Sequence, residues 1–193
     1  MFVGGADVSG DKRREGERNY IAFLVGTKER INKIYDNIGI DGIHMSELSD
    51  PQREQVRRNL DFKHNDVRAW CFHVQRQHIE DYFIHHSRLK NPKLPKISIH
   101  KNFDHYLLRS IKDDLEKFVF PYHQELSDIV VQTDWDMKHT IEHWKMQRVD
   151  EGIAFQLADA IAWFNQKHIR IDNCKDMDLR DYIKSSMEQD LLR

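Results

Sequence analysis

Residues 152–166 constrain the fold of this chain more than any other stretch, because they are apolar almost all round and contain one charged residue, Asp159. A segment of this length without a polar face predicts a buried helix. Burying an isolated carboxylate costs several kcal/mol, which is comparable with the net stability of a whole domain. Asp159 must therefore be paired, protonated or bound to a cation, and both a structural and a functional role are open.

The remaining apolar runs predict an α/β fold. Residues 2–8 and 19–26 are too short for independent helices and predict two strands paired as a hairpin. Residues 67–74 and the β-branched run 127–133 predict two further strands. Apolar residues at helical spacing predict helices at residues 28–37, from residue 51, at 75–86, 102–120 and 178–192.

The length of the chain, 193 residues, predicts a single domain over residues 1–193. Residues 75–120 read as a helical segment inserted into it, because the Pro-containing loop 91–95 separates two helical patterns.

Charge and cysteine content exclude several classes of protein. Lys and Arg number 30 and Asp and Glu 32, so any polyanionic partner must bind a local patch or act through metal ions. The two cysteines form no C-x-x-C pair, which disfavours a disulfide framework or a thiolate zinc site. The chain shows no run long enough for a membrane helix and no signal-peptide pattern, so we expect a cytoplasmic protein without membrane contact.

Carboxylates occur where strands and helices end or turn. Asp7 ends the first apolar strand, Asp134 ends the run 127–133, and Glu47 stands between two predicted helices. Clusters of carboxylate oxygens suit Mg²⁺ or Mn²⁺, and two such ions about 4 Å apart can activate a water molecule and stabilise the leaving oxygen of a phosphodiester. Without metal, four gathered carboxylates would repel one another.

The order of these acids resembles that of the ribonuclease H-like superfamily of nucleases, transposases and integrases. Two fragments sharpen the resemblance, A-D-V-S-G-D at residues 6–11 and F-Q-L-A-D-A-I-A at residues 155–162. They look like the D-E-S-G-D and Q-L-A-D-L-I-A signatures of an uncharacterised branch of that superfamily, although Val8 stands where the branch usually has Glu. The resemblance implies a ribonuclease H-like mixed sheet flanked by helices.

The resemblance also implies a metal-dependent nuclease that acts on DNA or RNA. It makes Asp7, Glu47, Asp134 and Asp159 both metal ligands and catalytic residues, with Asp136 as the alternative to Asp134. Asp136 is also a candidate accessory residue of the site. So are Gln156, Lys12 and His44, each of which can instead be a solvated, packed or capping side chain.

Two other functions remain open. One is a non-catalytic binding or scaffold module, in which basic and aromatic residues form a face: Arg53, Arg57, Arg58, Lys63, Arg68 and Trp70. More remotely, residues 139–143 match the inverted zincin pattern H-x-x-E-H, in which His139 and His143 bind zinc and Glu142 is the general base of a peptidase. The many aromatic residues are consistent with a homodimer.

Overall fold

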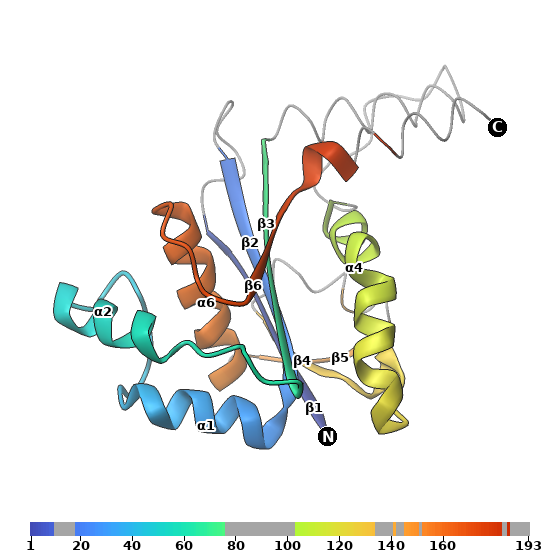
Figure 1. Cartoon of the computed structure of the whole chain (residues 1–193), viewed down its shortest axis with the longest axis horizontal. Helices are drawn as coiled ribbons and strands as arrows, with labels where there is room; N and C mark the ends of the chain where they lie inside the picture. Colours follow the sequence, from blue (N-terminus) through green and yellow to red (C-terminus); the bar gives the residue numbers. More distant parts are fainter. Residues whose placement is uncertain are drawn as a thin grey trace.

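The computed structural model describes residues 1–9, 18–75, 103–133, 141, 145–150, 152–182 and 185. Its strands form one six-stranded sheet in the order β5-β4-β1-β2-β3-β6 (Figure 1). The strands are β1 (Phe2–Ser9), β2 (Arg18–Thr27), β3 (Val67–Gln75), β4 (Val130–Thr133), β5 (Gln147–Val149) and β6 (Cys174–Asp178).

The sheet is mixed, with β1 near its centre. β2 runs antiparallel to β1 and to β3, as the predicted hairpin requires. On the other side of β1, β4 and then β5 join in parallel, and β6 joins β3 in parallel at the far edge. Because β1 and β4 are parallel, the end of β1 that carries Asp7 lies beside the C-terminal end of β4.

Helices cover both faces of the sheet (Figure 1). The helices are α1 (Lys28–Ile38), α2 (Asp50–Asn59), α4 (Phe103–Val119) and α6 (Ile153–Gln166), and two short 3-10 turns are η2 (Phe120–Tyr122) and η3 (Leu126–Asp128). Successive residues of β2 alternate between the faces: Phe23 packs with α4, and Ala22 and Leu24 pack with α1, α2 and α6. This confirms an α/β fold with a mixed sheet flanked by helices.

The ends of α1 and α2 follow the local sequence. The Thr27 hydroxyl accepts a hydrogen bond from the Arg30 N–H (3.3 Å), and Gly39 ends α1 with a left-handed φ of 65°. At α2, the Gln52 side chain reaches back to accept the Ser49 N–H (3.0 Å). The predicted starts of both helices are confirmed.

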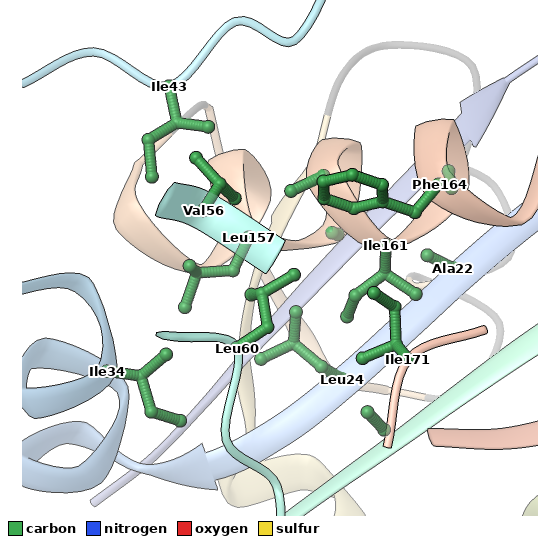
Figure 2. Close-up of a cluster of buried hydrophobic side chains, with 14 of the residues drawn as sticks. Ala22, Leu24, Ile34, Ile43, Val56, Leu60, Leu157, Ile161, Phe164 and Ile171 are labelled. Atoms are coloured by element: carbon green, nitrogen blue, oxygen red, sulfur yellow. The ribbon is translucent and has the colours of Figure 1, made fainter. Parts of the chain in front are cut away.

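Helix α6 lies directly on β1, because Gly5 leaves room for it. A Cβ atom at Gly5 would stand 1.9 Å from the Ala154 carbonyl oxygen, closer than any real contact. The Gln132 side chain of β4 accepts the Ala154 N–H at the start of α6 (2.7 Å). Figure 2 shows the buried side of α6, where Leu157 and Ile161 meet Val56 of α2 and Leu60.

Some predicted segments differ from the structure or lie beyond its described part. Strands β5 and β6 were not predicted. Of the segment 75–120 read as an insertion, residues 103–119 form α4, whose Ile111 and Leu115 are fully buried against the sheet, while residues 76–102 lie outside the described residues. The described helices contain none that is long and apolar enough to cross a membrane.

Candidate functional site

Two of the predicted acids meet in the folded chain. Asp7, near the end of β1, is only 8% exposed, and Asp159 is half-buried in the middle of α6. Their side chains share a hydrogen bond. A hydrogen bond between two carboxyl groups needs a proton on one of them, and without a proton or a cation the two negative charges repel each other. We call Asp7 and Asp159 the carboxyl pair.

The surroundings of Asp159 act on its pKa in opposite directions. Burial raises the pKa of Asp159, since the charged form loses water. The hydrogen bond from the Met45 N–H, the nearby charge of His44 and the hydrogen bond with Asp7 each lower that pKa, but burial prevails and the net pKa is raised. The protein therefore favours a neutral Asp159 more than water does.

Helix α6 holds the loop before α2 through two side chains one turn apart. The Gln156 side-chain oxygen accepts the Ile43 N–H (2.8 Å), and Asp159 Oδ2 accepts the Met45 N–H (3.1 Å). Ile43 and Met45 are fully buried, which fixes the loop from its other side. Gln156 thus orients the loop beside the carboxyl pair.

Arg53 fastens the same loop from α2. Its Nε donates to the Met45 carbonyl oxygen (3.0 Å), and its guanidinium lies 5.0 Å from the centre of the Trp163 ring on α6. Neither contact is visible in the sequence pattern, since Arg53 looks like one of many exposed basic residues.

The loop carries the two remaining predicted residues that the structure describes. His44 and Glu47 are both exposed, and the Glu47 N–H donates to the His44 carbonyl oxygen (2.9 Å). His44 is close enough for its charge to act on Asp159. The structure therefore brings Asp7, Asp159, Gln156 and His44 to one place and puts Glu47 on the adjoining loop.

Several predicted residues lie outside the described part: Lys12, Asp134, Asp136, His139, Glu142 and His143. The strand that precedes Asp134 ends at Thr133, which pairs with Ala6, the neighbour of Asp7. The Thr133 hydroxyl donates to the Ala6 carbonyl oxygen (2.9 Å). Within the described residues, His, Cys, Asp and Glu side chains form no group of three or more that could hold a metal ion.

Comparisons with known proteins found no match in sequence and a similarity in structure. No protein-family model matches the chain. No curated protein matches it in sequence. Among solved structures, the chain is similar to ribonuclease HII in the PCNA:RNase HII complex from Archaeoglobus fulgidus, with 12% identity and a TM-score of 0.47, over 100% of this chain and 89% of that chain. The strand order and the helix layers of the molecule itself define its class as a mixed-sheet α/β domain.

Proposed function

We propose that this protein is a ribonuclease H-like, divalent-metal-dependent nuclease that hydrolyses phosphodiester bonds of nucleic acid. The observation that supports this most is the carboxyl pair. The two acids, from β1 and α6, share a hydrogen bond in a largely buried position, where their mutual repulsion costs free energy unless a proton or a cation lies with them.

The chemistry of the donor atoms fits Mg²⁺ or Mn²⁺. Both ions prefer carboxylate oxygens and keep several water molecules, so a site with two protein carboxylates and an open side suits them. Asp7 and Asp159 would hold the ion, with Glu47 and Asp134 (or Asp136) as the further ligands that we propose. The bound ion would supply a nucleophile at neutral pH by lowering the pKa of water, and charge stabilisation at the phosphate.

The described residues around the pair support this chemistry by position. Gln156 and Asp159 together hold the backbone of residues 43–45, so the loop keeps a fixed place beside the pair. His44 on that loop is exposed and close to Asp159, which suits an exchange of protons between the reacting phosphate and water.

A second function, the non-catalytic binding module, has one observation in its favour. Asp159 already accepts a hydrogen bond from the backbone N–H of Met45 and shares a side-chain hydrogen bond with Asp7. A carboxyl used in this way can stabilise the loop without any metal.

Metal binding and cleavage separate the two functions. We would measure Mn²⁺ and Mg²⁺ binding by calorimetry for the wild type and for Asp159→Asn, and cleavage of labelled single- and double-stranded DNA and RNA. The nuclease predicts that binding and cleavage are both lost in Asp159→Asn. The matched control is Asp113→Asn, which removes an exposed carboxylate from α4 on the other face of the sheet and should change neither. If the wild type binds no metal and cleaves no substrate, the nuclease proposal fails and the binding module is the remaining function.

A further inference from the structure

Basic side chains gather around a hollow at the end of α2, on the helical layer that also carries the loop beside the carboxyl pair. The hollow lies between the last turn of α2, the segment that follows it, and the residues after α6. Its basic and apolar lining residues are Arg57, Arg58, Lys63, Arg170, Leu60 and Ile171.

The floor of the hollow is rigid. Leu60 and Ile171 are 4% and 3% exposed, and both belong to the core that α2 and α6 share. Figure 2 shows both residues in the cluster of buried side chains that also contains Leu24 and Ile161. The surrounding cations therefore project from a fixed apolar base.

The charge around the hollow is not fully balanced. Glu54 accepts hydrogen bonds from both Arg57 (2.8 Å) and Arg58 (2.8 Å), so one carboxylate serves two guanidinium groups. These bonds lower the pKa of Glu54 to about 2, which keeps it charged. Among the described residues, the side chains of Lys63 and Arg170 have no hydrogen-bond or ion-pair partner.

Two carboxylates also line the hollow, and they do not cancel its four cations. Asp61 lies 3.5 Å from the imidazole of His64 and accepts the Lys63 N–H, and Asp172 acts on Arg57. The local excess is positive although the whole chain has a formal charge of -2. In a chain of this overall charge, a polyanion that binds without metal ions needs such a local excess.

We propose that this hollow binds the phosphate groups of a nucleic-acid strand. Guanidinium and ammonium groups are the usual partners of phosphodiester oxygens, and these contacts position a strand without reading its sequence. The inference rests on the proposed function, which makes this strand the substrate, and it adds a binding site for that substrate.

The path from the hollow to the carboxyl pair has a suitable length. Helix α2 has 10 residues and spans about 15 Å, and it begins shortly after the loop that Asp159 holds. One strand of a duplex carries a phosphate about every 3.4 Å, so a strand along α2 would pass roughly four phosphates. Arg53, one turn before Arg57 on α2, and Lys167, on the Trp163 ring, lie along this side.

Binding in the absence of metal tests the inference apart from cleavage. Fluorescence anisotropy of labelled single-stranded oligonucleotides, with EDTA and at several salt concentrations, would compare the wild type with the double variant Lys63→Gln/Arg170→Gln. We expect the double variant to bind roughly tenfold more weakly, with a log–log salt slope reduced by about 1.4, which corresponds to two lost phosphate contacts on a single strand. The control, Lys33→Gln/Lys117→Gln, removes two exposed charges from α1 and α4 and should retain the wild-type affinity.

A variant with the opposite expected effect guards against misfolding as the cause. Glu54→Gln frees Arg57 and Arg58 from their shared carboxylate and should tighten binding a few-fold. Equal affinity of the wild type and the double variant would overturn the inference, as would binding of inorganic phosphate without any binding of oligonucleotide.

The two proposals fail in different ways. If oligonucleotide binding depends on Lys63 and Arg170 but the protein never cleaves, the proposed binding site in the hollow stands and the proposed nuclease function fails. If cleavage is lost in Asp159→Asn but binding does not depend on Lys63 and Arg170, the nuclease function stands and the binding site in the hollow fails.

Discussion

The Asp7 carboxyl on β1 shares a hydrogen bond with the Asp159 carboxyl on α6, although the two residues lie near opposite ends of the chain. The same Asp159 also accepts the Met45 N–H. One side chain thus joins β1, α6 and the loop before α2. Substitutions at Asp159 can separate the effect of its charge from the effect of its hydrogen bonds.

Substitution of Asp159 by Asn and by Ala should affect stability in opposite directions. In metal-free solution, at a pH high enough to ionise Asp159, Asp159→Asn removes the buried charge and keeps an oxygen for the Met45 N–H, so we expect a gain on the order of 1 kcal/mol. Asp159→Ala leaves that N–H without a partner and should cost about 1–3 kcal/mol. Urea unfolding measures both. Equal losses in the two variants would mean that the charge itself stabilises the fold.

The raised pKa of Asp159 predicts how stability changes with pH. Its pKa is higher in the folded chain than in the unfolded one, so between these two values the folded state binds more protons. The contribution of Asp159 is fully present below the unfolded value and is lost as pH rises through the folded value. In thermal unfolding with EDTA, the stability of the wild type should therefore fall with rising pH between these two pKa values, and Asp159→Asn should lack this fall. At the upper end of that pH range, added Mn²⁺ should restore the stability of the wild type but not that of the variant. Identical pH profiles of wild type and variant would contradict this.

Glycine at position 5 is required for the contact between β1 and α6. Gly5→Ala would place a methyl group 1.9 Å from the Ala154 carbonyl oxygen, both backbones being rigid there, so we expect a loss of about 3 kcal/mol or more. Gly4→Ala is the control, because its nearest atom would be 3.2 Å away and a smaller cost should follow. Denaturant midpoints compare them. A mild effect at Gly5 would mean that α6 can move off β1.

Gln156 should govern the order of the loop before α2. Gln156→Ala removes the acceptor of the Ile43 N–H, and hydrogen exchange at residues 43–47 should become faster by about tenfold or more, as expected for the loss of roughly 1–3 kcal/mol. Gln166→Ala, which removes a hydrogen bond to Ser9 at the other end of α6, should leave this loop unchanged. Unaltered exchange in Gln156→Ala would show that the burial of Ile43 and Met45 alone fixes the loop.

The hydrophobic pattern predicts much of the fold, because strand and helix periodicity are local properties. The hairpin of β1 and β2, the caps of α1 at Thr27 and Gly39, and the helical residues around Asp159 follow from neighbouring residues in the sequence. Strand β6 has the sequence C-K-D-M-D, which carries no such pattern. It forms because β3 offers it an unpaired edge, and this is a tertiary condition.

The candidate site also has a part that local sequence predicts and a part that depends on tertiary contacts. The lone charge of residues 152–166 marks Asp159 as exceptional, and Asp7 stands at the end of the first apolar run, so both acids are recognisable as candidates from local sequence. Roles for Asp134, Glu47 and the metal remain predictions, as do a cytoplasmic location and a homodimer. The pairing of Asp7 with Asp159, the hydrogen bond from Ile43 to Gln156 and the contact of Arg53 with Trp163 arise from the folded arrangement. These contacts join segments far apart in the chain, and they depend on the close packing of α6 on Gly5, which no local pattern encodes.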